Sequence, residues 1–450
     1  MQYYVIVVRP SDGSVLALPS DGGWTVPNFA PENTDARIVE HINAEMRWQL
    51  GIDTWTLKHA ARGVENGQTW RIYVAVMRDH NELDVNGAEW LTRDDVSSTQ
   101  FILPAVGYEI ERWFVSVDHP SSLRTAWEEI GWHAAACEWI ITQLSALGLT
   151  AISPVTQQRA WGLSCTMMVA TNAGDVYFKA TPEFMAHEGR AMQSVADRCP
   201  ELLSAPLAVD ADSGWVLMQD YGGKMLHECS DISVWEEALR VFSNAQVAQA
   251  AQAHIGFWQA LNIPDRRIGR MVDMIDPLIA ACEHMMSGGE NGLSDTEIDA
   301  MRSLSMPLKL LCARLAQYAV PHTMVHGDLG GNILIQESGF TYFDWTDICV
   351  SHPFFEMATI SGAYFDDRAL KDSPDAEARL RNAYLEAWTE YLPRARLIEA
   401  LEESRPLGAL HQMMTYMWIR TNIPPDARPE LDGGLLHWTR NLLRLCGKSQ

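Results

Sequence analysis

The sequence predicts an α+β protein, with strand-rich stretches in the first half of the chain and helices in the second. Apolar, β-branched runs such as 3–8 and 71–77 recur before residue 222, and such runs are typical of strands. From residue 232 onward, long segments with the helical spacing of apolar residues prevail. A short strand-like insert at 325–345 interrupts these helices. Together, the three observations indicate a sheet-rich part followed by a helical body.

Length, charge and cysteine usage limit the class of protein. For 450 residues, about 100–200 residues per domain gives two or three domains. A formal charge of -24 argues against nucleic acid or membrane partners, because both require clustered Lys and Arg. No apolar run reaches the roughly 18–20 residues of a membrane span, and the N-terminus lacks signal-peptide features. The eight cysteines include no CxxC pair. We therefore expect a cytoplasmic protein with reduced thiols.

The first predicted domain covers residues 1–118 and combines strands with one internal helix over 35–51. Its apolar positions recur every four residues and mark one buried face, and they are Ile38, Ile42, Met46 and Leu50. Gly51 is placed to end this helix. The segment 114–123, with its Pro-Ser-Ser break, is the predicted linker to the next domain.

The second predicted domain, residues 119–222, begins with a helix over 122–147 and continues with strands. The tetrapeptide Asn172–Asp175 lies between two strand-like runs and predicts a hairpin turn, since Asn and Gly tolerate positive φ. The third predicted domain, residues 223–450, is helical apart from the insert. The order of sheet-rich and helical parts is typical of a bilobal enzyme.

Five residues occur where phosphoryl transfer would require them. Lys179 lies on a predicted strand and Glu188 on the following helix, and such a pair can hold a lysine against nucleotide phosphates. Asp328 could accept a hydroxyl proton, while Asn332 and Asp344 offer the hard oxygen ligands that Mg²⁺ prefers. Phosphoryl transfer depends mainly on positioning and charge neutralisation, so this set is nearly sufficient.

The stretches "VHGDLGGNILI" and "FTYFDW" resemble the catalytic segment of the aminoglycoside phosphotransferase family of small-molecule kinases. The resemblance covers about 150–420. It implies a protein-kinase-like bilobal fold, with a sheet-rich small lobe and a helical large lobe, that uses ATP and Mg²⁺. It also implies Asp328 as catalytic base, and "MQDYGG", with Asp220 and Tyr221, as the hinge over the adenine. Glu356 stands where that family more usually has Asp.

Two features depart from the family pattern. Only Gly162 is present where a glycine-rich phosphate loop would be expected. The spacer between Asp328 and Asn332 has three residues instead of four. We expect Gly330 and Gly331 to compensate by opening backbone regions closed to other residues, including positive φ, so that Asn332 still reaches a metal.

Residues 1–115 resemble a Nudix hydrolase domain through "WTVPNF", "AEMRWQLGI", "RIYVAVM" and "EWLTRDDV". Glu45 matches the first glutamate of the family's metal-binding helix. Trp48 and Gln49 replace the following glutamate pair, and neither supplies an anionic ligand for Mg²⁺. We therefore expect a Nudix-like α/β scaffold without hydrolase chemistry, and an unrelated α/β domain is the alternative.

These observations lead to one hypothesis and two rivals. The preferred hypothesis is an ATP- and Mg²⁺-dependent phosphotransferase acting on a hydroxyl of a small molecule, such as an amino sugar, an amino alcohol or a related metabolite. The first rival is a pseudokinase or nucleotide-binding scaffold whose shortened loop cannot place both metals. The second is a Nudix-type hydrolase. The acceptor itself is not specified by the sequence, because substrate choice in such folds depends on helices of the large lobe.

Overall fold

The computed structural model describes residues 1–78, 87–250, 252–286, 292–360, 370, 373 and 375–447. The chain forms two compact units. Unit 1 comprises residues 1–183, 215–220 and 422–429, and unit 2 comprises residues 184–214, 221–421 and 430–450. The division into domains at 118/119 and 222/223 stays a prediction. Among the helices that the structure describes, none has a stretch of sufficient length and hydropathy to span a lipid bilayer.

Unit 1 contains two sheets. The first sheet has the strand order β3-β2-β1-β6-β5, with β4 paired to β1 and β7 paired to β2. The β1–β6 pair is parallel. The strands are β1 (Gln2–Val8), β2 (Val15–Ser20), β3 (Gly23–Thr25), β4 (Asn28–Phe29), β5 (Thr54–Glu65), β6 (Gln68–Met77) and β7 (Glu89–Leu91). The helices and 3₁₀ turn of this unit are α1 (Glu40–Leu50), α2 (Arg93–Ser98), α3 (Pro104–Asp118), η1 (Ala126–Glu128) and α4 (Trp132–Ala146).

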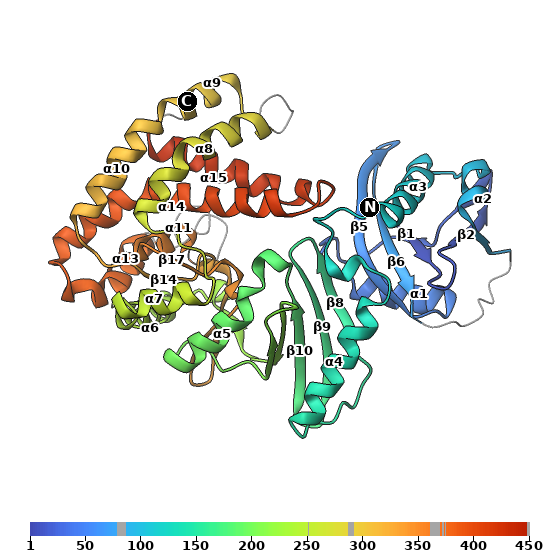
Figure 1. Cartoon of the computed structure of the whole chain (residues 1–450), viewed down its shortest axis with the longest axis horizontal. Coiled ribbons are helices and arrows are strands. Elements are labelled where there is room, and N and C mark those ends of the chain that lie inside the picture. Colours follow the sequence, from blue (N-terminus) through green and yellow to red (C-terminus); the bar gives the residue numbers. More distant parts are fainter. Residues whose placement is uncertain are drawn as a thin grey trace. The chain divides into compact units, whose positions relative to one another are not determined.

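The second sheet of unit 1 contains β8 (Thr156–Trp161), β9 (Ser164–Thr171), β10 (Gly174–Ala180) and β12 (Trp215–Gln219). Its antiparallel order is β12-β10-β9-β8, and β8, β9 and β10 lie side by side in Figure 1. The hairpin predicted at Asn172–Asp175 is confirmed, because β9 ends at Thr171 and pairs with β10 from Gly174 onward. Helix α4 packs on this sheet through aromatic contacts of Trp132 and Trp139 with Phe178 and Trp215, at ring-centroid distances of 5.5–6.2 Å.

Three boundaries differ from those that the sequence predicted. Helix α1 starts at Glu40, because Ile38 instead forms an antiparallel bridge with Arg159 of β8. Helix α3 continues to Asp118, since its Trp113 and Phe114 are buried, so the predicted linker starts at residue 119. The helix predicted from 122 begins at Trp132 after the left-handed Gly131, with φ 96°. Gly51 ends α1 with a φ of 68°, as predicted.

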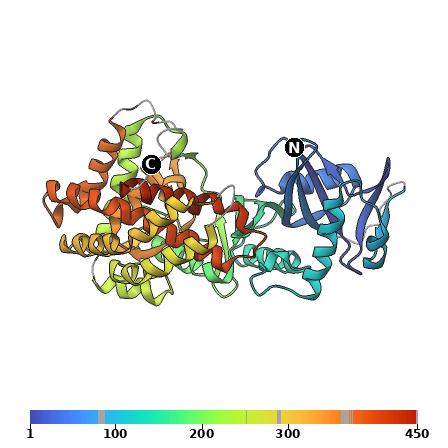
Figure 2. The same cartoon turned by 90° about the horizontal axis from the view of Figure 1, so that it is seen from above.

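Unit 2 is mainly helical (Figure 2). Its helices are α5 (His187–Arg198), α6 (Ile232–Ala248), α7 (Gln252–Ala260), α8 (Ile268–Met286), α9 (Asp295–Ser303), α10 (Ser305–Gln317), α11 (Met357–Ile360), α13 (Ala376–Glu386), α14 (Arg394–Asn422, with Asn422 in unit 1) and α15 (Asp432–Leu445). Its strands are β11 (Ala208–Asp210), β13 (Lys224–Met225), β14 (Thr323–Val325), β15 (Ile333–Gln336), β16 (Gly339–Tyr342) and β17 (Cys349–Ser351). Its 3₁₀ turns include η4 (Leu329–Gly331), η5 (Trp345–Asp347) and η6 (Pro353–Glu356).

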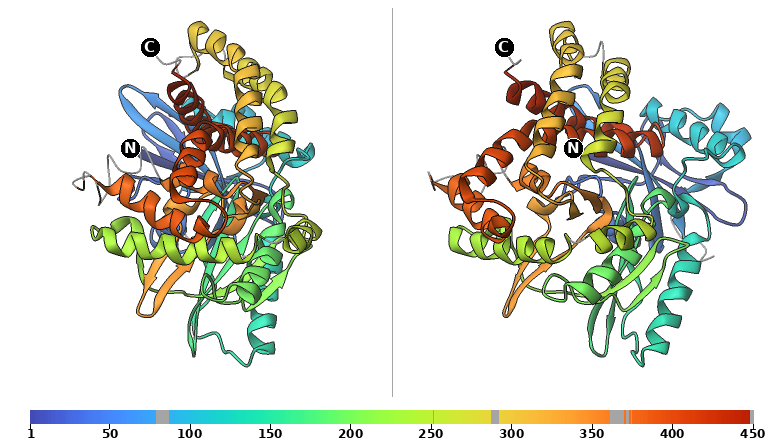
Figure 3. Two further views of the ribbon diagram at one scale, coloured as in Figure 1. Left: turned by 90° about the vertical axis from the view of Figure 1, so that its left-hand side faces the viewer. Right: turned by 60° about the vertical axis from the view of Figure 1, so that its left-hand side comes forward.

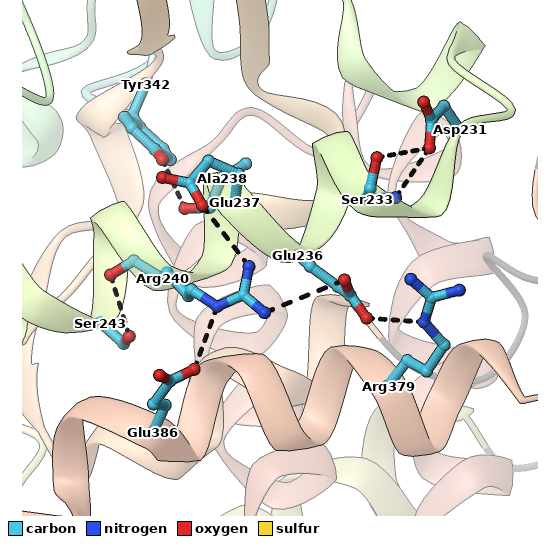
Figure 4. Close-up of polar contacts among 10 residues, drawn as sticks. All are labelled: Asp231, Ser233, Glu236, Glu237, Ala238, Arg240, Ser243, Tyr342, Arg379 and Glu386. Carbon is cyan, nitrogen blue, oxygen red and sulfur yellow. Dashed lines mark hydrogen bonds and ion pairs between the residues drawn. The ribbon is translucent and has the colours of Figure 1, made fainter.

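The β15–β16 hairpin of the strand insert, orange in Figure 3, extends away from the helices in both views. The hairpin pairs with β13 along one edge, and β14 pairs with β17. The buried Tyr342 of β16 anchors it, because its hydroxyl donates to the carbonyl of Ala238 on α6 at 2.6 Å (Figure 4). Helix α6 is in turn joined to α13 by the Arg240–Glu386 and Arg379–Glu236 ion pairs, at 3.0 and 2.6 Å. The insert is thus attached to the helical body.

Candidate phosphotransfer site

The centre of the candidate site is the turn that follows β14. This strand is fully buried and pairs with β17, so the chain leaves it in a fixed direction at His326. Asp328 and the 3₁₀ turn η4 come next, and β15 begins directly after Asn332. A rigid strand on each side of a short turn is the arrangement that can hold reactive groups in place.

The short spacer brings Asn332 back to Asp328. The Asn332 side-chain Nδ2 donates to the backbone carbonyl of Asp328 at 2.7 Å and to its carboxylate Oδ2 at 3.0 Å. The turn is closed by the Asn332 amide, which donates to the Leu329 carbonyl at 3.1 Å. A three-residue spacer is therefore long enough to put these two side chains in direct contact.

The two glycines of this turn differ in their surroundings. A Cβ on Gly330 would lie 2.1 Å from the carbonyl oxygen of Thr359, whereas a Cβ on Gly331 would meet nothing within 4 Å. Neither glycine is among the residues with positive φ, so positive φ is not the way in which they accommodate the shortened spacer. Gly330 is instead required by the close approach of α11, where a methyl group would have no room.

The backbone of Phe343 connects the turn to the second half of the insert. Its N–H donates to the carbonyl of Asn332 at 3.1 Å, and its carbonyl lies 2.9 Å from Nε2 of His326. A carbonyl can only accept, so His326 carries its proton on Nε2. His326 is fully buried and thus fixes the residue immediately before Asp344.

Asp344 has an unusual backbone, with φ 62° and ψ 66° in the left-handed region. Such a conformation in a residue other than Gly persists where the surrounding structure holds it, and it clusters at functional sites. Here the Thr346 hydroxyl donates to Asp344 Oδ1 at 2.8 Å, and His187 of α5 bonds the Thr346 carbonyl at 3.1 Å. Burial lowers the pKa of His187 to about 4, so the ring is neutral at pH 7 and donates its Nε2 proton.

The side chain of Glu356 holds the first two residues of the turn by hydrogen bonds. The two oxygens of its carboxyl group accept the backbone N–H groups of His326 at 2.8 Å and Gly327 at 3.1 Å. Burial raises the pKa of Glu356 to about 8, against the two backbone donors, and the charge of Asp328 adds to the rise. On the other side of Gly327, the side chain of Gln412 donates to its carbonyl at 2.6 Å. The backbone N–H and the backbone carbonyl of Gly327 are therefore both hydrogen-bonded to side chains.

The donor set fits a magnesium ion that is shared with phosphates. Because Asn332 uses its Nδ2 toward Asp328, its Oδ1 is the atom left to ligate a cation. Asp344 supplies an oriented carboxylate. Mg²⁺ typically takes one or two protein oxygens and completes its shell with water and substrate phosphates. The described residues contain no group of three or more His, Cys, Asp and Glu that could hold a metal without such help.

The predicted nucleotide-binding residues are divided between the two units. Lys179 lies on β10 in unit 1, where it is in register with Val216 of β12. Glu188 is buried on α5 in unit 2. The Asp220 amide in unit 1 donates to the Asp175 carbonyl at 2.9 Å, and the Tyr221 carbonyl in unit 2 accepts from Gln336 at 2.6 Å. Their joint action on a nucleotide stays a prediction.

Helix α1, which resembles the Nudix metal helix, carries no cluster of carboxylates. Glu45 Oε1 accepts the side-chain amide of Gln49 at 2.8 Å, and Trp48 is 80% exposed to solvent. The Nudix identity of the N-terminal region stays a prediction.

Several residues that hold the candidate site in place were not predicted from the sequence. Phe343 contacts the site through two backbone hydrogen bonds, Thr346 through its hydroxyl and Gln412 through its side-chain amide. Gln412 lies on α14, far along the chain from Gly327. No local pattern distinguishes such residues, although the position of Glu356 was indicated by the resemblance.

No family model matches this chain, and no curated protein matches it. Among solved structures, it is similar to a macrolide 2'-phosphotransferase type I, with 15% identity over 67% of this chain and 97% of that chain, and a TM-score of 0.48. It is similar to an ethanolamine kinase of Plasmodium vivax, with 10% identity over 73% and 93% and a TM-score of 0.48. It is also similar to a spectinomycin phosphotransferase in complex with ADP and spectinomycin, with 10% identity over 68% and 98% and a TM-score of 0.42. With TM-scores below 0.5, these likenesses assign neither a family nor an activity to this chain.

Proposed function

We propose that this protein is an ATP- and Mg²⁺-dependent phosphotransferase that phosphorylates a hydroxyl group of a small molecule, such as an amino sugar, an amino alcohol or a related metabolite. The observation that carries the proposal is the contact of Asn332 with Asp328 at 3.0 Å across the shortened spacer. The contact keeps the proposed base, Asp328, and the proposed metal ligand, Asn332, next to each other on one turn, as phosphoryl transfer requires.

The roles follow from the chemistry of each group. Asp328 accepts or orients the proton of the acceptor hydroxyl, and its hydrogen bond from Asn332 holds the carboxylate in one orientation. Asn332 Oδ1 and the Asp344 carboxylate would hold Mg²⁺, which supplies charge neutralisation on the phosphates when it is bound. Lys179 contacts the phosphates, and Glu188 orients Lys179. Asp220 and Tyr221 form the segment beside the adenine.

The test is ATP consumption by the full chain with Mg²⁺ and a panel of amino sugars and amino alcohols. Asp328→Asn should reduce turnover by about 10²–10⁴-fold, the usual contribution of a general base, and leave nucleotide binding nearly unchanged. Asp299→Asn is the matched control, since this carboxylate lies on α9 and is 74% exposed. Nucleotide binding without turnover on any acceptor would favour the pseudokinase, and normal turnover by Asp328→Asn would remove Asp328 from the mechanism.

A further inference from the structure

Residues 37–39, in the loop before α1, pair with the edge strand β8 of the second sheet through an isolated β-bridge. Ile38 forms an antiparallel bridge with Arg159 of β8. The Ala160 amide donates to the carbonyl of Arg37 at 3.0 Å, and the Val39 amide donates to the carbonyl of Gln158 at 3.0 Å. An edge strand exposes unpaired backbone groups, and the N-terminal region pairs those of β8 close to its end.

The two sheets also share buried side chains. Ala160 of β8 is 1% exposed and belongs to the hydrophobic core of the first sheet, together with Val39, Ile42 and Met46. Gln157 is 2% exposed, and its amide group binds both polar atoms of the Thr56 backbone, at 2.8 and 2.9 Å. It also accepts from Asn43 at 3.0 Å. Strand β8 is therefore fixed to β5 and α1 along most of its length.

The turn between β8 and β9, Trp161–Ser164, is supported on one side by Arg37. The guanidinium carbon of Arg37 lies 5.5 Å from the centre of the Trp161 ring, within the range of a cation–π contact. Two hydrogen bonds to Asp35 hold this guanidinium, at 2.9 and 2.8 Å. Inside the turn, the Trp161 indole donates to the hydroxyl of Ser164 at 2.9 Å.

The segment 422–429 also packs against the β8–β9 turn. A Cβ on Gly162 would lie 3.1 Å from the Cβ of Ala427, so the single glycine of this turn packs closely against this segment. Gly162 is not among the residues with positive φ. The segment is attached to the first sheet by an ion pair between Lys58 of β5 and Asp426 at 2.9 Å, and Glu128 lies 3.7 Å from the same ammonium group.

We propose that the N-terminal region positions the β8–β9 turn for the phosphates of the nucleotide. This inference rests on the proposed function. In protein kinases, a glycine-rich loop covers the phosphates and the strand bearing the lysine follows; here the β8–β9 turn precedes β10 and Lys179 in the same order. A flexible loop must be ordered when it binds a ligand, and each immobilised rotamer-rich side chain weakens affinity by up to about tenfold. A turn that is already held by residues 37–39 and 422–429 avoids this cost and has no need of further glycines.

Hydrogen exchange and nucleotide binding by the full chain test the two parts of the proposal. The Ala160 amide is a direct reporter, because its bond to Arg37 joins the N-terminal region to β8. The combined variant Arg37→Ala/Gln157→Ala removes the cation–π contact and the Gln157 bonds. The matched control is Arg47→Ala/Gln158→Ala. Arg47 lies on α1, is largely exposed and pairs with Asp53, and the Gln158 side chain donates to the hydroxyl of Thr156 in its own strand. Titrations with ATP and with AMP then separate phosphate contacts from adenine contacts.

We expect slow exchange of the Ala160 amide in the wild type and in the control, and faster exchange in the combined variant. The variant should bind ATP about tenfold more weakly and AMP with unchanged affinity. Fast exchange of Ala160 in the wild type would overturn the inference, and this measurement is independent of whether the variant folds. Faster exchange with unchanged ATP affinity would overturn the positioning role. If the wild type binds neither nucleotide, the proposed function fails and the positioning role fails with it, while Ala160 exchange still reports on the contact itself.

Discussion

The paired substitutions Gly330→Ala and Gly331→Ala test how the shortened spacer works. The added methyl groups are identical and lie on consecutive residues, but their surroundings differ. At Gly330 the new Cβ would lie 2.1 Å from the Thr359 carbonyl oxygen and 2.9 Å from its carbonyl carbon. At Gly331 it would meet nothing within 4 Å. Backbone atoms cannot rotate away as a flexible side chain can, so the turn or α11 must move.

The expected magnitudes follow from this difference. Overpacking of a tight site costs about 1–3 kcal/mol, which lowers the melting temperature of a domain of roughly 150–250 residues by about 2–4 °C per kcal/mol. A displacement of about 1 Å at a reacting group can reduce turnover about 10²-fold. Gly330→Ala should therefore lower both stability and turnover. Gly331→Ala should be neutral, or stabilise by up to about 1 kcal/mol through the unfolded state.

Thermal unfolding and acceptor-dependent ATP consumption of both variants measure these effects side by side. Asn332→Ala provides the reference for loss of the Asp328 contact. The reasoning is refuted if the two alanine variants behave alike, or if Gly331→Ala is the more damaging one. If Gly330→Ala is destabilised but keeps normal turnover, the close approach of Thr359 is structural and has no part in positioning Asn332.

Three further predictions concern groups around the same turn. Glu356, with its pKa raised from 4.5 to about 8, binds more protons in the folded than in the unfolded state between these values. The contribution of Glu356 to the free energy of unfolding should therefore fall as pH rises through this window, by about 1.4 kcal/mol per pH unit. Buried histidines such as His187 titrate in the same range with the opposite sign, so denaturant titrations at several pH values should show the Glu356 slope in the difference between the wild type and Glu356→Gln, and a difference that does not change with pH would contradict it. Thr346→Val removes the hydroxyl that orients Asp344 and should weaken nucleotide binding with Mg²⁺ but not without it, whereas Thr346→Ser should behave as wild type; equal behaviour of the two variants would contradict this role. Lys179→Ala should raise the KM for ATP with little effect on folding, and an unchanged KM and ATP affinity would remove Lys179 from the phosphate site.

Much of the local structure could be predicted because its cause is local. The hairpin at 172–175 forms where Asn and Gly interrupt two apolar runs, and α1 ends at Gly51 because glycine adopts positive φ without strain. The candidate site was predicted in the same way. Asp328, Asn332 and Asp344 lie in one short stretch of sequence, and their chemical types predict phosphoryl transfer. The closeness of Asp328 and Asn332 could be expected from the sequence, because only three residues separate them.

The features that the sequence did not predict depend on segments that are distant along the chain. Ile38 has the spacing of a helical residue, but it pairs with β8 because that edge strand offers unpaired backbone groups. Gly330 needs to be glycine because of Thr359, and the peptide at Gly327 is held by Glu356 and Gln412. The sequence by itself determined which chemical groups are present and which short elements form, since both depend on neighbouring residues. The tertiary structure alone decided where the polar backbone atoms find partners and which glycines lack space for a methyl group, because those interactions exist only after distant segments have packed together.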